Sequence, residues 1–173
     1  MWFQNGKNTL ITQHLDPLPF DQYQQFRQAL GTRSLVMRQQ YPCRLMTGAE
    51  DHDWLLLFFQ PMIDQFAPGQ PLQQIFVSLE LPGARFMMHR SHANIQQVLV
   101  YSPYQNLYTL DYLTQPAPDA PDYWTPPPES AVIQVPLLAN CVLSIDTAQA
   151  LHWGQSAAIP LGGVQQLVWI YLG

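Results

Sequence analysis

From about residue 74 to its end, the chain consists of short β-rich segments separated by turn residues, and this spacing constrains the fold most. The segments rich in β-branched and aromatic side chains, which favour strands, are residues 75–81, 95–101, 107–113, 131–135, 141–145, 151–153 and 164–172. Pro82-Gly83 and a proline-rich stretch at residues 115–129 mark breaks between them. Short strands at close spacing indicate a β-barrel or a β-sandwich.

The first third of the chain carries helical patterns instead. Residues 20–30 form one such pattern, and residues 54–66 (WLLLFFQPMIDQF) are apolar enough for a buried helix. Pro61 predicts a kink in that helix or a division into two shorter pieces. A length of 173 residues is typical of one domain. We therefore expect a mainly β (α+β) fold, with a helical layer over about residues 1–70 and a β core over about residues 74–173.

Charge and cysteine content exclude several functional classes. The chain has 7 basic and 12 acidic side chains, a net charge of −5 and no basic run, which argues against nucleic-acid binding. No apolar stretch reaches the ~18 residues of a membrane span, and the N-terminus lacks the pattern of a signal peptide. Cys43 and Cys141 lie far apart without a CxxC motif, so we interpret them as free thiols of a cytoplasmic protein.

Three histidines, His89, His92 and His152, fall within the predicted β region. A strand alternates its faces, so Arg85 shares a face with His89 if residues 84–89 are extended, whereas His92 falls on the opposite face. Two histidines on adjacent strands of one barrel can jointly hold a metal, because neutral imidazole is a good ligand for iron, zinc or copper. The alternative is that each histidine caps a strand or makes a hydrogen bond in the core, and spacing alone favours this alternative.

The order of these pieces resembles that of the iron(II)/2-oxoglutarate-dependent oxygenases, most closely the small prolyl-hydroxylase-type members. That family has a strand ending in Pro-Gly or similar, an apolar segment into a His-x-Asp motif, and then an apolar strand ending in Tyr. Residues 81–92 (LPGARFMMHRSH) and 95–101 have this layout. Residues 136–145, His152 with the following Trp-Gly, and residues 164–172 fit the family's later strands and its distal histidine.

The resemblance implies a double-stranded β-helix, or jelly-roll barrel, and an oxidoreductase of the dioxygenase type. It implies that His89 and His152 hold Fe(II), with His92 as a further candidate ligand, and that 2-oxoglutarate is the second cofactor. In the family, two histidines and one carboxylate bind one face of the iron, and a basic residue on the last strand pairs with the far carboxylate of 2-oxoglutarate. The substrate is a small molecule or a peptide that the sequence does not identify, and a homodimer is one assembly that it leaves open.

The sequence departs from the family pattern in two places. Ser91 stands where the carboxylate of the His-x-Asp motif is expected, and Gln165 and Gln166 stand where the basic residue of the last strand is expected. No Arg or Lys follows His92, so Arg85 is the predicted substitute cation.

A carboxylate can also be lost or displaced in such a site. Asp111 or Asp146 could supply a displaced one. The halogenating branch of the family lacks the carboxylate altogether and has a small residue in its place, as Ser91 is here.

Two further interpretations use the same barrel. The first is a non-catalytic relative that serves as a binding or scaffold protein, with or without a metal held by His89, His92 and His152. The second is a cupin-like metal-binding or sugar-binding protein, since one barrel architecture supports many functions.

Overall fold

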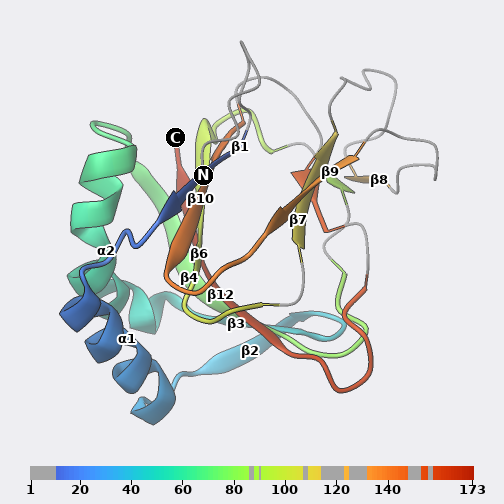
Figure 1. Cartoon of the computed structure of the whole chain (residues 1–173), viewed down its shortest axis with the longest axis horizontal. Helices are drawn as coiled ribbons and strands as arrows, with labels where there is room; N and C mark the ends of the chain where they lie inside the picture. Colours follow the sequence, from blue (N-terminus) through green and yellow to red (C-terminus); the bar gives the residue numbers. More distant parts are fainter. Residues whose placement is uncertain are drawn as a thin grey trace.

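The computed structural model describes residues 11–85, 88–89, 91–106, 109–113, 123–124, 132–147, 153–155 and 158–173. In chain order the elements are β1 (Ile11–Leu15), α1 (Phe20–Thr32), β2 (Met37–Tyr41), β3 (Arg44–Thr47), the short 3-10 helix η1 (Ala49–Asp51), α2 (His52–Phe66), β4 (Leu72–Glu80), β5 (Met88–His89), β6 (Gln97–Ser102), β7 (Thr109–Leu113), β8 (Tyr123–Trp124), β9 (Val132–Pro136), β10 (Cys141–Asp146), β11 (Trp153–Gly154) and β12 (Gln165–Leu172). Figure 1 shows the two helices on one side of a β structure.

The strands form two sheets that face each other. The larger sheet, called sheet A here, has the order β1-β10-β6-β12-β4-β3-β2, and the smaller sheet B has the order β8-β5-β11-β7-β9. Neighbouring strands pair antiparallel in both sheets. From β4 to β7 and again from β10 to β12, successive strands alternate between the two sheets. This alternation is the winding of a double-stranded β-helix, so the predicted fold class is confirmed.

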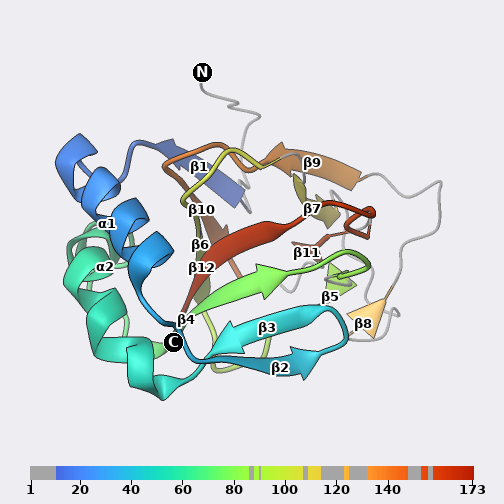
Figure 2. The same cartoon turned by 90° about the horizontal axis from the view of Figure 1, so that it is seen from below.

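Helices α1 and α2 cover the outer face of sheet A (Figure 2). Phe26 of α1 and Phe59 of α2 are fully buried against Tyr101 of β6, with ring centroids 5.9 and 5.0 Å from the Tyr101 ring. Of the two alternatives predicted for Pro61, a kink or a division into two pieces, the division is wrong, because α2 continues through Pro61 as one helix. Pro61 is exposed, as is Leu57 four residues earlier, so water can reach the carbonyl that the proline leaves without an intrahelical donor.

A second apolar cluster fills the space between the two sheets. Phe76 of β4, Val98 of β6 and Trp169 of β12 contribute to it from sheet A, and Trp153 contributes from sheet B. Because strand residues alternate in direction, residues 76, 78 and 80 of β4 and the odd positions of β12 face this interior. These positions carry the candidate functional site.

The turn before β10 links the N-terminal segment to sheet A. Asn140 has a positive φ of 46°, a conformation that asparagine tolerates better than most residues. Its side chain accepts a hydrogen bond from the Tyr101 hydroxyl at 3.0 Å and donates one to the Leu18 carbonyl at 2.9 Å. Burial raises the pKa of Tyr101, so its hydroxyl stays protonated and donates this bond.

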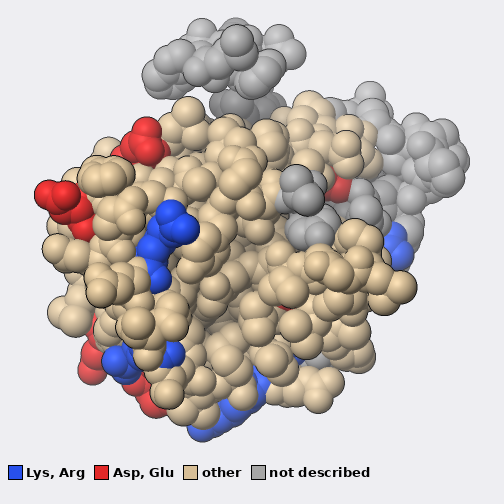
Figure 3. All heavy atoms as spheres, turned by 60° about the horizontal axis from the view of Figure 1, so that its bottom comes forward, with Lys and Arg blue, Asp and Glu red and all other residues tan. Residues whose placement is uncertain are grey.

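Cys43 and Cys141 are both free thiols, the first half-buried and the second buried. In the described part of the chain, no helix has the length and apolar character needed to cross a bilayer. On the face that Figure 3 shows, the arginine side chains lie at separate places on a surface that is mostly uncharged.

Candidate functional site

The pairing of β5 with β11 brings together two segments that the resemblance requires to meet. His89 pairs with Trp153, and Trp153 pairs on its other side with Tyr112 of β7. Trp153 is fully buried in the interior cluster. The backbone of His89 therefore runs beside the residue that directly follows His152. The side chain of His89 and the whole of His152 lie outside the described residues, so joint metal binding by the two stays a prediction.

Ser91 takes the place of the expected carboxylate, two residues after His89. Its hydroxyl accepts a hydrogen bond from the indole nitrogen of Trp153 at 3.2 Å. The side chain at this place is thus neutral, and it already has an interior partner. Within the described residues, no group of three or more His, Cys, Asp or Glu side chains is arranged to hold a metal.

Asp111, one candidate for a displaced carboxylate, lies on β7 in sheet B. Leu110 and Tyr112, its neighbours on β7, belong to the interior cluster, so alternation places Asp111 on the opposite face of the strand. Asp111 is nevertheless only 1% exposed, and one of its oxygens accepts a hydrogen bond from the Thr109 hydroxyl at 2.6 Å. Asp111 therefore lies on the face of β7 that points away from the interior cluster, and its role as a displaced carboxylate stays a prediction. His92 is exposed.

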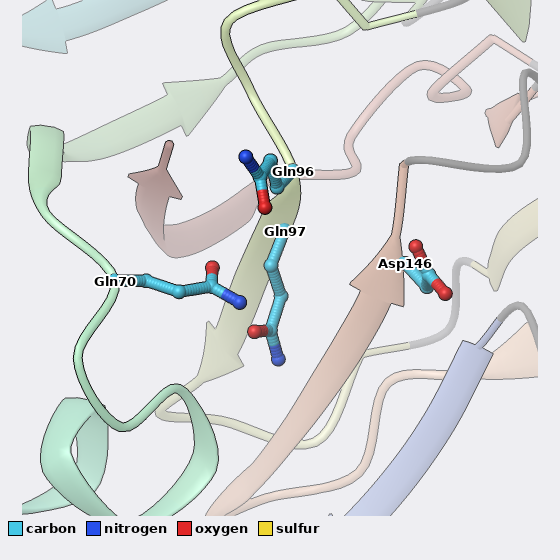
Figure 4. Close-up of a pocket in the computed structure, with 4 residues that line it drawn as sticks. All are labelled: Gln70, Gln96, Gln97 and Asp146. Atoms are coloured by element: carbon cyan, nitrogen blue, oxygen red, sulfur yellow. The ribbon is translucent and has the colours of Figure 1, made fainter.

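Asp146 lies at a different place, in a pocket of about 270 Å³ that it lines with Gln70, Gln96 and Gln97. Figure 4 shows Gln70 and Gln97 extending toward each other across this pocket. The Gln97 amide already donates hydrogen bonds to Ser144 Oγ at 2.6 Å and to the Phe66 carbonyl at 3.1 Å. Asp146 therefore lies away from the space between the sheets and is not a substitute metal ligand there.

Only one of the two predicted glutamines reaches the interior. Gln165 is 1% exposed and has the same parity on β12 as Leu167 and Trp169, which belong to the interior cluster. Gln166 is half-buried and has the parity of Val168, which packs toward the helices. Neither the amide oxygen nor the amide nitrogen of Gln165 has a hydrogen-bond partner in the described part of the chain.

A buried ion pair lies beside Gln165. Glu80 of β4 is the register partner of both Arg44 on β3 and Gln165 on β12. Arg44 Nη2 lies 2.6 Å from Glu80 Oε1, and the two side chains are 9% and 1% exposed. The Arg44 guanidinium also lies 5.9 Å from the ring centroid of Trp169. The sequence reasoning missed both charged residues, although Glu80 has the same parity as Phe76.

Ser78 completes this group, which we call the polar layer: Arg44, Ser78, Glu80, Gln165 and Trp169. The Trp169 indole nitrogen donates to Ser78 Oγ at 2.7 Å, and the Ser78 hydroxyl donates to Glu80 Oε1 at 3.4 Å. Glu80 Oε2 has no partner in the described part of the chain. Burial raises the pKa of the Glu80 carboxyl, and the Arg44 charge opposes this rise.

The structure corrects the prediction that Arg85 is the interior cation. The chain leaves β4 at Glu80 and turns through Gly83, whose φ is +87°. Arg85 follows this turn and is exposed, so its side chain does not lie in the buried interior. Among the described basic residues, the buried one is Arg44.

The chain matches no protein-family model and no curated protein, but solved structures share its fold. The first is HygX from Streptomyces hygroscopicus with nickel and 2-oxoglutarate bound, at a TM-score of 0.63 and 13% identity over 95% of this chain and 83% of that one. The second is SnoN, a non-heme alpha ketoglutarate dependent epimerase from nogalamycin biosynthesis, at a TM-score of 0.67 and 14% identity over 94% and 78%.

A Pseudomonas putida prolyl-4-hydroxylase is also similar, at a TM-score of 0.53 and 14% identity over 94% of this chain and 91% of that one. Identities this low establish the fold alone. The resemblance to 2-oxoglutarate-dependent oxygenases is therefore confirmed for the fold. The HygX structure holds nickel and 2-oxoglutarate, and a structure of SnoN holds Fe3+ and alpha ketoglutarate, so both proteins bind a metal and the keto acid that the resemblance implies.

Proposed function

We propose that this chain is a binding protein on the oxygenase fold, which holds a ligand in the barrel interior and does not turn over 2-oxoglutarate. One observation carries this proposal. The start of β12 has the neutral Gln165 where the family has a cation, and the buried Arg44, two strands away on β3, is already paired with the Glu80 that lies between them.

The polar layer does not fit the far carboxylate of 2-oxoglutarate. Arg44 and Glu80 together carry no net charge, so a second carboxylate would leave one buried negative charge without a partner. An uncompensated buried charge costs several kcal/mol. In the family, the basic residue on the last strand removes this cost by pairing with the far carboxylate. A neutral ligand avoids this penalty.

The candidate metal site also lacks a charged group that the family has. His89 and His152 would supply two neutral nitrogen ligands, and Ser91 supplies a hydroxyl that Trp153 already engages. The family's iron site has two histidines and one carboxylate, and the carboxylate contributes the negative charge. The described residues therefore do not provide the third ligand.

A second candidate function is the oxygenase activity itself, with Fe(II) held by His89 and His152 and with 2-oxoglutarate as cosubstrate. The register of β5 on β11 favours it, because this pairing brings the His89 backbone beside the segment of His152. When bound together, iron and 2-oxoglutarate activate dioxygen. If this candidate is right, the site works without the carboxylate ligand that Ser91 replaces. It also works without the family's cation, which Gln165 of the polar layer replaces.

One experiment separates the two candidates. The protein is purified anaerobically, its metal content is measured, and succinate formation is followed after addition of Fe(II), 2-oxoglutarate and air. We expect no more succinate than a His89→Ala variant produces. The matched control is His52→Ala, which removes a histidine at the start of α2, outside the candidate site. Succinate formation that disappears in His89→Ala and persists in His52→Ala would establish the oxygenase and overturn the proposal.

A further inference from the structure

Three buried polar atoms without hydrogen-bond partners lie on neighbouring strands at one end of the interior. They are Oε2 of Glu80 and both Oε1 and Nε2 of Gln165. Each residue is 1% exposed, and the two are directly opposite in the β4–β12 register. Buried polar groups without partners cost about 1–3 kcal/mol each. Three such atoms at one place therefore require an explanation.

The surrounding residues do not satisfy these atoms. Arg44 and Ser78 both direct their hydrogen bonds to Oε1 of Glu80 and leave Oε2 open. The Gln165 amide does not bond to Glu80 in either orientation, since neither its nitrogen nor its oxygen has a partner. Exchanging the two amide atoms therefore does not remove the deficit. The described protein atoms therefore leave these three atoms open to a partner from outside the chain.

The three atoms specify the chemistry of that group. Glu80 Oε2 and Gln165 Oε1 need hydrogen-bond donors, and Gln165 Nε2 needs an acceptor. A primary carboxamide has two N–H donors and one carbonyl acceptor, and it can form two parallel hydrogen bonds with another amide. A carboxylate has no donor and adds a negative charge beside Glu80. One water molecule cannot form two parallel bonds to both atoms of the Gln165 amide.

We propose that this end of the barrel binds the primary carboxamide of a small molecule. The carboxamide carbonyl accepts from Gln165 Nε2, one N–H donates to Gln165 Oε1, and the other N–H donates to Glu80 Oε2. Trp169, which lies in the same layer, supplies an apolar surface beside the carboxamide. This inference rests on the proposed function, because it names the ligand class of the same interior site.

The test uses two probes that differ at one end only: glutaramate, which ends in a carboxamide, and glutarate, which ends in a carboxylate. Isothermal titration of the full chain at neutral pH measures both affinities. We expect glutaramate to bind at least tenfold more tightly than glutarate. Gln165→Arg should invert this ratio, because it adds a cation to a layer that is otherwise neutral.

Two further variants separate recognition from folding. Gln165→Leu should abolish the preference for glutaramate, whereas Gln166→Leu, on the opposite face of β12, should leave it unchanged. Gln165→Asn keeps an amide on a shorter side chain, so it should weaken glutaramate binding but retain the preference. Thermal unfolding of each variant checks that it is folded.

Equal affinities for the two probes, a preference of the wild type for glutarate, or no binding of glutaramate would each overturn the carboxamide assignment. None of these results involves succinate formation. Failure of the carboxamide assignment therefore leaves the proposed function standing, and succinate formation by the wild type would reject the proposed function on its own.

Discussion

Replacing Arg44 by Met tests whether the buried ion pair organises the interior. Methionine keeps an apolar side chain of similar length but removes the guanidinium that lies 2.6 Å from Glu80. At an effective dielectric constant of about 20, opposite charges about 4 Å apart attract each other by about 4 kcal/mol. Removal of one partner of a buried pair typically costs about 3–5 kcal/mol. Since a domain has roughly 5–15 kcal/mol of stability in total, this loss should lower the urea midpoint substantially.

The chain provides a matched control for this variant. Arg38 and Glu50 form a pair at a comparable distance of 2.7 Å, but their side chains are 61% and 37% exposed. Exposed pairs contribute about 0.2–1 kcal/mol, so Arg38→Met should have a small effect. Arg44→Met combined with Glu80→Leu should recover much of the lost stability, because no buried charge then remains without a partner.

The loss in Arg44→Met should also depend on pH. Burial already raises the pKa of Glu80, and removal of the Arg44 charge raises it further. The folded protein then binds the Glu80 proton more tightly than the unfolded chain, whose Glu pKa is about 4.3. Stability therefore falls as pH rises between these two pKa values and recovers as pH is lowered through the folded pKa. A loss at pH 7 no larger than that of Arg38→Met, or one independent of pH, would refute this reasoning.

Three further predictions concern single side chains. Ser91→Asp restores a carboxylate two residues after His89 and should raise Fe(II) affinity at least tenfold, as measured by metal titration under anaerobic conditions. Tyr101→Phe removes the hydroxyl that donates to Asn140 and should cost about 1–3 kcal/mol in urea unfolding, because a buried acceptor loses its donor. Burial raises the pKa of Cys141 to about 11, so iodoacetamide should alkylate this thiol at pH 8 only after the protein is unfolded.

The sequence predicts where the strands of the barrel lie along the chain better than it predicts which strands pair with each other. The β-rich segment at residues 75–81 and the apolar end of the chain became β4 and β12, because strand formation follows local composition. Their parity also follows from the sequence, and this places Gln165 and Glu80 on the same face once the two strands pair. That β3 pairs with β4 is not visible in the sequence, since residues 42–47 carry no clear strand signal.

Arg44 was missed for this reason, and Arg85 was selected for a related one. The inward direction of Arg85 depended on strand alternation over residues 84–89, whereas the Arg85 side chain is exposed. The interior cation, Arg44, lies on β3, and β3 enters the sheet through its pairing with the distant strand β4. Burial of a charged residue also depends on its ion-pair partner, and Glu80 lies 36 residues further along the chain.

The buried pair gives the two candidate functions opposite proton linkages. If the interior accepted the far carboxylate of 2-oxoglutarate, Arg44 could serve it only when Glu80 is neutral, so binding would take up a proton at Glu80. Affinity for 2-oxoglutarate would then increase as pH falls toward the raised pKa of this carboxyl. A carboxamide needs the ionised Glu80 oxygen as an acceptor, so its affinity would decrease over the same range. Titrations in buffers of different ionisation enthalpy measure this proton uptake directly, and proton uptake on glutaramate binding would contradict the role assigned to Glu80.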